Sequence, residues 1–194
     1  MAHIETGNNY PGILSLMYYK SSSGEALSHL AETILRGPSP LTPGDRELIA
    51  AYVSYLNQCE FCHASHSAAA ANHLGNESLV GEACQNPFTA PLSEKMRALL
   101  SIAASVQKGG KAVSPREIEH ARKTGANDEE IHDTVLVAAA FCMYNRYVDG
   151  LGTKPARPEE YAPMGERLAK KGYAYPPAPI RWLVRRLLNR QFES

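Results

Sequence analysis

Hydrophobic residues recur at intervals of three and four positions along most of the chain, the spacing that is typical of amphipathic α-helices. Before Gly37-Pro38 this stripe consists of Leu27, Leu30, Ile34 and Leu35. After it, the stripe continues through Leu48, Ile49, Tyr52, Val53 and Leu56. Nowhere does a convincing run of alternating β-branched residues suggest a strand. The pattern therefore predicts an all-α fold.

Start signals divide the first half of the chain into helices. Thr42-Pro43 places a hydroxyl N-cap before a proline at the first helical position, so one helix is expected to begin there. Asn57 is expected to cap a new helix, with Glu60 three residues later in a capping-box-like arrangement. That alanine-rich helix is expected to end at Gly75, with Cys59 in its first turn and Cys62 just beyond it.

Three more helices are expected in the second half. They are a helix from about Leu92 to Val106, a helix opened by Ser114-Pro115 that closes at Gly125, and a long apolar helix from Ile131 to about Val148 opened by Asn127. The two halves resemble each other, because Leu41, Arg46 and Leu48 recur 51 residues later as Leu92, Arg97 and Leu99. This pattern indicates a weak two-fold internal repeat of a helical unit.

The C-terminal stretch 180-IRWLVRRLLNRQFES-194 forms a separate feature. Its apolar face comprises Ile180, Leu183, Val184, Leu187 and Leu188, and its basic residues are Arg181, Arg185, Arg186 and Arg190. A basic amphipathic helix of this kind can lie on a membrane surface, but docking on its own or a neighbouring subunit is favoured. The expected division is a helical domain over 1–155 and a C-terminal extension over 156–194.

Composition narrows the class of protein. Of 194 residues 44% are hydrophobic and 21% charged, as in a globular domain, and 20 basic residues balance 20 acidic ones. A neutral chain lacks the basic excess of nucleic-acid binders. No apolar run reaches bilayer length and no secretory signal opens the chain, so we expect a cytoplasmic protein with no membrane partner. Four cysteines in a reducing compartment favour catalysis or metal binding over structural disulfides.

The stretch 57-NQCEFCHASH-66 gathers two cysteines and two histidines, and three chemistries use such clusters. Cys59, Cys62 and His63 fit the C-x-x-C-H string of covalent haem attachment, which generally follows export. Cys59, Cys62 and His66 lie on one side of a helix and are compatible with zinc, although no second knuckle is present. Cys84 and Cys142 stand alone, as small buried hydrophobes often do.

Thiol redox chemistry uses more of the sequence. A nucleophilic cysteine must be a thiolate, which a helix N-terminus or a histidine favours. His66 lies one turn after Cys62 and is placed to take its proton. Glu47 on the preceding helix can orient His66 if the chain folds back near Asn57, while solvent exposure or pairing with Arg46 is the alternative for Glu47.

The spacing of Glu47, Cys59, Cys62 and His66 matches the E-x11-C-x-x-C-x-x-x-H core of the alkylhydroperoxidase D family, a branch of the carboxymuconolactone decarboxylase superfamily. The stretches 36-RGPSPLTPGDRELIAAYVSYLNQCEFC-62 and 127-NDEEIHDTVLVAAAFCMYNRYVDGLG-152 resemble its peroxidase-related subgroup. The likeness covers roughly residues 10 to 155. It implies an all-α, homo-oligomeric fold (dimer, trimer or hexamer).

The resemblance also assigns roles. Cys62 is the peroxidatic nucleophile, Cys59 the resolving thiol, and Glu47 with His66 the proton relay. The activity implied is cofactor-free reduction of a hydroperoxide in antioxidant defence, with an external dithiol as reductant. Two alternatives stay open: a redox-sensing disulfide switch without turnover, and a decarboxylase, which needs no cysteine pair. Phe61 departs from the family, whose best-understood members have a histidine just before the second cysteine.

Overall fold

The computed structural model describes residues 2–192, and within them every regular element is a helix, so the prediction of an all-α fold is confirmed. The helices are α1 (Ile13–Tyr19), α2 (Ser21–Arg36), α3 (Pro43–Leu56), α4 (Glu60–Leu74), α5 (Glu77–Gln85), α6 (Glu94–Lys108), α7 (Pro115–Lys123), α8 (Asp128–Gly150), α9 (Pro158–Lys171) and α10 (Arg181–Phe192), with two short 3-10 turns at Gly110–Ala112 and Ala178–Ile180. The sequence patterns do not predict α1, α5 or α9. No described helix is long and apolar enough to cross a bilayer.

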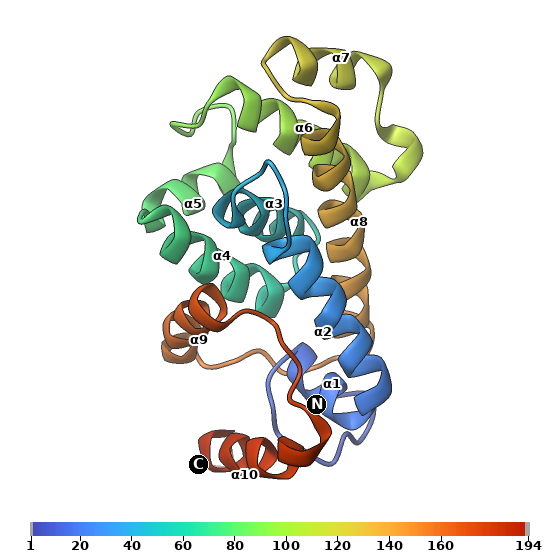
Figure 1. Cartoon of the computed structure of the whole chain (residues 1–194), viewed down its shortest axis with the longest axis vertical. Coiled ribbons are helices and arrows are strands. Elements are labelled where there is room, and N and C mark those ends of the chain that lie inside the picture. The colour runs from blue at the N-terminus through green and yellow to red at the C-terminus, as the bar shows by residue number, and fades with distance from the viewer. Residues whose placement is uncertain (1, 193–194) are drawn as a thin grey trace.

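Helix α3 lies at the centre, with α4 against one side and the long α8 against another (Figure 1). Its middle is buried on all sides, since Ile49, Ala50 and Val53 have no exposed surface. The N-cap predicted at Thr42 is present, and it forms a capping box with Asp45 at the third helical position. Because this part of α3 is enclosed by other helices, the polar side chains of Glu47 and Ser54 on it are held away from water.

The junction between α3 and α4 differs from the prediction. Asn57 ends α3 instead of capping α4, and the N-cap of α4 is Cys59. Gln58 adopts the left-handed conformation at φ 58°, its N–H bonds to the carbonyl of Tyr55, and the N–H of Cys59 bonds to the carbonyl of Ser54. This is the Schellman pattern of helix termination, with glutamine where glycine is usual. The correction places Cys62 in the first turn of α4.

The internal repeat is present in the structure. The N-caps of α3 and α6 are Thr42 and Ser93, and those of α5 and α8 are Asn76 and Asn127, each pair 51 residues apart. The positions 51 residues after Glu47, Cys59, Cys62 and His66 hold Ala98, Gly110, Val113 and Glu117. Only the first copy therefore carries the polar cluster.

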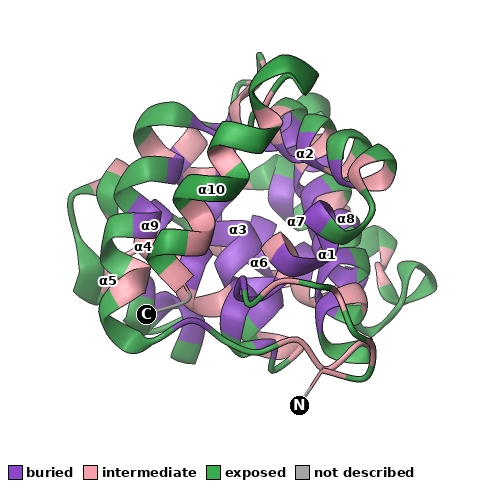
Figure 2. Ribbon diagram, turned by 90° about the horizontal axis from the view of Figure 1, so that it is seen from below, coloured by how far each residue is buried: buried purple, intermediate pink, exposed green. Residues whose placement is uncertain are grey.

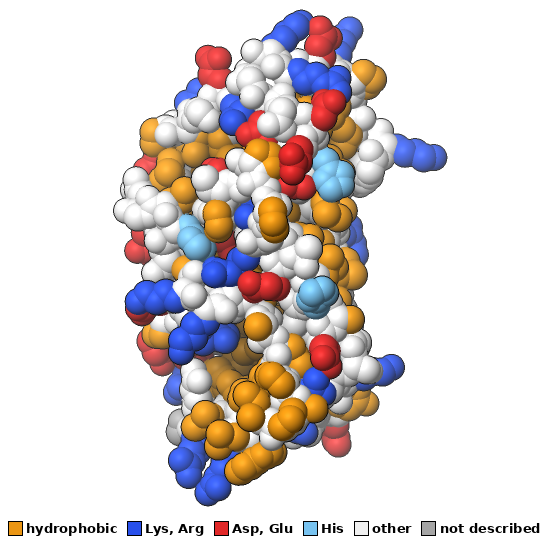
Figure 3. Space-filling view, in the orientation of Figure 1, with side chains coloured by type: hydrophobic (Ala, Val, Ile, Leu, Met, Phe, Trp, Pro, Cys, Tyr) orange, Lys and Arg blue, Asp and Glu red, His pale blue; other side chains and the backbone are white. Residues whose placement is uncertain are grey.

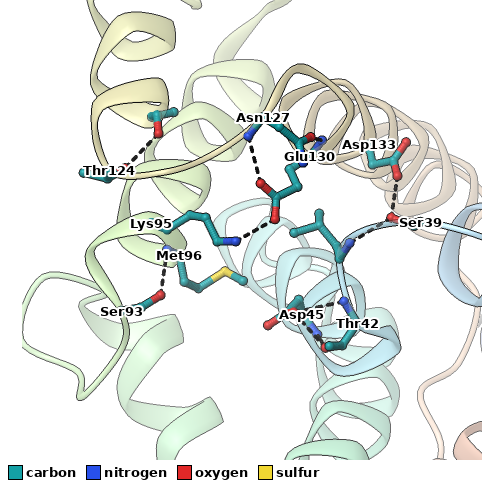
Figure 4. A network of polar contacts seen from close by, with 12 residues as sticks. Ser39, Thr42, Asp45, Ser93, Lys95, Met96, Thr124, Asn127, Glu130 and Asp133 are labelled. Carbon is teal, nitrogen blue, oxygen red and sulfur yellow. Dashed lines mark hydrogen bonds and ion pairs between the residues drawn. The ribbon is translucent and has the colours of Figure 1, made fainter.

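Polar contacts join α6 to α8 within the second copy, and join α8 to the segment before α3 (Figure 4). Lys95 on α6 binds the buried Glu130 on α8 at 2.6 Å, and Glu130 also accepts from the backbone of Asn127. Ser39, just before α3, donates to Asp133 on α8 at 2.5 Å. Of these contacts, the one from Ser39 joins the start of α8 to the segment that leads into α3.

The segment after residue 155 folds back over the first copy. Helix α9 packs closely on α4, because Gly165 leaves no side chain to meet Ala68; a Cβ there would lie 2.4 Å from the Ala68 Cβ. Helix α10 then lies across the lower end of the molecule (Figure 2). The side chain of Tyr10 hydrogen-bonds to Asn189 on this helix. Arg181 pairs with Glu25 on α2. The last two residues of the predicted tail, 193–194, lie outside the described part.

Candidate active site

Glu47 and His66 form a buried pair between α3 and α4. The Oε2 atom of Glu47 lies 2.7 Å from Nδ1 of His66, and Glu47 is 1% exposed. A carboxylate accepts this hydrogen bond, so Nδ1 of His66 is the donor and Nε2 is the ring nitrogen left to take or give a proton. The pair thus holds the histidine as a base whose free nitrogen points away from Glu47.

Tyr173, which lies far along the chain, contacts both Glu47 and His66. Its hydroxyl donates to Oε1 of Glu47 at 2.6 Å, and its ring stacks on His66 with centroids 5.8 Å apart and 11° between the planes. Burial, followed by the negative charge of Glu47, raises the pKa of Tyr173 well above its usual value. The hydroxyl therefore stays protonated and remains a donor to Glu47.

The backbone of Tyr173 is anchored on α2. Its N–H donates to Glu32 at 2.6 Å, and its carbonyl accepts from Ser28 at 2.6 Å. Arg36 donates to the carbonyl of Ala169 at 2.7 Å, at the end of α9. These bonds fix the turn after α9, so the Tyr173 ring is held in place over His66.

Cys59 and Cys62 lie side by side at the start of α4, as free and buried thiols. A hydrogen bond donated by the Cys59 thiol is the largest influence on Cys62 and lowers its pKa. Burial acts in the opposite direction and raises the pKa of Cys62. The charge of His66 and a hydrogen bond from Asn145 lower it further. The same donated bond, with burial, raises the pKa of Cys59. Of the two thiols, Cys62 is therefore the one that loses its proton more readily.

Asn145 on α8 belongs to a polar network behind the thiols. Its Oδ1 accepts from Asn57 at 2.8 Å, its Nδ2 donates to Ser54 at 3.0 Å, and it is 1% exposed. Asn57 in turn accepts from Gln107 on α6 at 2.9 Å. The network fixes the amide that faces Cys62, and it explains why an asparagine stands at the end of α3.

The remaining candidates lie elsewhere. His63 faces α3, where its Nδ1 lies 3.2 Å from the Ala51 carbonyl, and burial lowers its pKa. Cys84 is in the apolar core, and burial raises its pKa to about 12. Within residues 2–192 no three His, Cys, Asp or Glu side chains are grouped so that they could hold a metal ion.

All four site residues named from the sequence meet at one place, and Tyr173 and Asn145 join them. Tyr173 is 107 residues from His66, and no local pattern around it signals a site. Asn145 could have been suspected as a polar residue on the apolar face of a predicted helix. The arrangement supplies two neighbouring thiols, of which Cys62 has the lowered pKa, and a histidine oriented by a carboxylate.

The chain matches the model of the carboxymuconolactone decarboxylase family twice, over residues 22–86 and over residues 77–152. The double match agrees with the internal repeat. A comparison with curated proteins gave no match. The matched segments contain Glu47, both cysteines and Asn145 but end before Tyr173.

Solved structures similar to this chain include two peroxidase-related proteins. An uncharacterized peroxidase-related protein from Silicibacter sp. TM1040 is 28% identical, with a TM-score of 0.72 and 78% of each chain covered. One from Ralstonia eutropha JMP134, described as an alkylhydroperoxidase AhpD core, is 25% identical, with a TM-score of 0.73 and 80% of each chain covered. ATU0492 from Agrobacterium tumefaciens, of unknown function, is 21% identical with a TM-score of 0.65, covering 75% of this chain and 99% of its own, and shares the fold.

Proposed function

The chain belongs to the carboxymuconolactone decarboxylase family, and from that premise we propose that it is a thiol-dependent hydroperoxide reductase of the alkylhydroperoxidase D type. The observation that carries the proposal is that two free thiols, Cys59 and Cys62, lie at the start of α4 beside the buried Glu47–His66 pair. A decarboxylase has no use for such a pair of thiols. The names of the peroxidase-related structures support the same activity.

In the first step the Cys62 thiolate attacks the terminal oxygen of the hydroperoxide. An S–O bond forms, the O–O bond breaks, and Cys62 becomes a sulfenic acid while the peroxide is reduced. The leaving alkoxide takes a proton from His66, which held the proton released by Cys62 on Nε2. Glu47 stabilises the charged histidine between these transfers, at the 2.7 Å distance to Nδ1.

In the second step the Cys59 sulfur attacks the Cys62 sulfenic acid. The S–S bond forms, the S–O bond breaks, and water leaves with the Cys59 proton. An external dithiol then reduces the disulfide by thiol exchange and is itself oxidised to a disulfide. This dithiol, the homo-oligomeric state and the cytoplasmic location stay predictions.

The test mixes reduced protein with one equivalent of an organic hydroperoxide and then titrates thiols in denaturant. We expect loss of two thiols per chain, and sustained peroxide consumption when a dithiol is supplied. Cys62→Ser should abolish both, and Cys59→Ser should stop at a sulfenic acid that dimedone traps. Undiminished consumption by both variants would refute the proposal, and thiol loss without sustained turnover would assign a redox switch instead.

A further inference from the structure

An apolar cavity of about 160 Å³ lies between α1, α4, α9 and α10, next to the candidate site. Most of its wall is hydrocarbon, contributed by Leu14, Met17, Met164, Leu168, Val184 and Leu188. His66 and Tyr173 form the part of the wall nearest the relay. A cavity of this kind, with few polar groups at one end, is the usual form of a small-molecule site.

A second, smaller cavity adjoins the first. Its volume is about 40 Å³, and its wall contains Cys62. Both cavities are lined by Ile13, Met17, Phe61, His66 and Tyr173, so these side chains form the boundary that the two share. One water needs roughly 10–15 Å³ measured in this way, so the smaller cavity has room for two oxygen atoms. A hydroperoxide group has that size.

The size of the larger cavity indicates what it accepts. An engineered apolar cavity of roughly 150 Å³ in another protein stays dry and binds benzene. The cavity beside His66 is of similar volume and similar lining. It therefore suits a single phenyl ring or a short branched alkyl group, and a long acyl chain exceeds it.

We infer that the two cavities form one binding site for a hydroperoxide with a compact apolar group, with the peroxide beside Cys62 and the hydrocarbon under α10. This inference rests on the proposed function and adds a choice of substrate. Hydrogen peroxide leaves the larger cavity unfilled, so this cavity adds no binding free energy for it. An aryl or short-alkyl hydroperoxide gains the free energy of moving its hydrocarbon from water into the apolar cavity.

Helix α10 forms the roof of this site. Val184 and Leu188 face the cavity, whereas Trp182, Leu183 and Leu187 on the same helix are 64%, 44% and 55% exposed. In the space-filling view hydrophobic side chains gather at this lower end of the molecule, with arginines beside them (Figure 3). The C-terminal extension thus provides Tyr173 to the relay and the roof to the substrate site.

The experiment compares Leu188→Trp, which fills the cavity, with Leu187→Trp, which adds the same ring on the exposed side of the same helix. The measured quantity is the ratio of kcat/KM for cumene hydroperoxide to kcat/KM for hydrogen peroxide. We expect a ratio of at least about ten in the unaltered chain, a fall of about tenfold in Leu188→Trp, and no change in Leu187→Trp. If Leu188→Trp does not fold, Val184→Phe takes its place.

A redox-inert probe separates this inference from the proposed function. Binding of 2-phenyl-2-propanol, followed by chemical shifts in NMR, should be seen in the unaltered chain and in Leu187→Trp and be lost in Leu188→Trp. That result supports the site even if no peroxide is consumed, in which case the proposed function alone fails. Equal ratios in all three proteins, or probe binding that Leu188→Trp leaves intact, would overturn the site while peroxide turnover stands.

Discussion

Replacing Cys59 by alanine removes the sulfhydryl that donates to Cys62, while Cys59→Ser keeps a donor of similar size. The hydrogen bond from Cys59 is the largest influence that lowers the pKa of Cys62, ahead of the charge of His66. With alanine the thiolate loses that bond, so the pKa of Cys62 should rise. With serine it should stay close to its value in the unaltered chain.

The expected size of the shift follows from the strength of the lost bond. A hydrogen bond to a charged group contributes about 1.5–3 kcal/mol, and one pKa unit corresponds to about 1.4 kcal/mol. Loss of the donor should therefore destabilise the thiolate by about 1.5–3 kcal/mol and raise the pKa of Cys62. His66→Gln should raise it by less, because its charge is the smaller influence.

The assay measures the rate of alkylation of Cys62 by iodoacetamide across pH, with the modified peptide quantified by mass spectrometry. Cys62 lines a cavity that Cys84 and Cys142 do not line, so these two cysteines serve as internal references in the same digest. Because only the thiolate reacts, the midpoint of the rate profile reports the pKa of Cys62. A midpoint that moves equally in the alanine and serine variants, or in neither, would refute the assignment of Cys59 as donor.

Two further predictions concern the junction that places the thiols. Asn57→Ala should lower the free energy of unfolding by about 1–3 kcal/mol in urea, because it leaves the Oδ1 atom of the buried Asn145 without its donor. Asn72→Ala on the exposed side of α4 should cost under about 0.5 kcal/mol, and similar losses in the two variants would contradict the role of the network. Gln58→Gly should raise the free energy of unfolding by up to about 1 kcal/mol, because glycine takes the left-handed conformation without strain. A measured loss would show instead that the Gln58 side chain makes a stabilising contact.

Much of the site could be predicted from spacing, because Glu47, Cys59, Cys62 and His66 lie on two consecutive helices that local signals delimit. The error at Asn57 has a physical reason. Asparagine is a good N-cap, and a left-handed residue at a helix end is usually glycine, so glutamine at Gln58 gives no stop signal.

The second half of the site could not be predicted in this way. Helix α9 carries Pro163 in its interior, which sequence rules treat as a helix breaker, so the sequence does not predict this helix. The turn after it brings Tyr173 to Glu47 across 126 residues of sequence. Such a contact is decided by the packing of α9 on α4 and by the anchoring bonds to α2, neither of which a local pattern records.

The position of Tyr173 also bears on how relatives of this chain are compared. The family match ends at residue 152, and the hydroxyl that holds Glu47 lies 21 residues beyond that limit. Two members can therefore agree at every aligned site position and still differ in whether the carboxylate has a second hydrogen-bond donor. Sorting members by the segment C-terminal to the matched region, and by whether it returns an aromatic hydroxyl to the histidine, would group them by chemistry where the shared core alone does not.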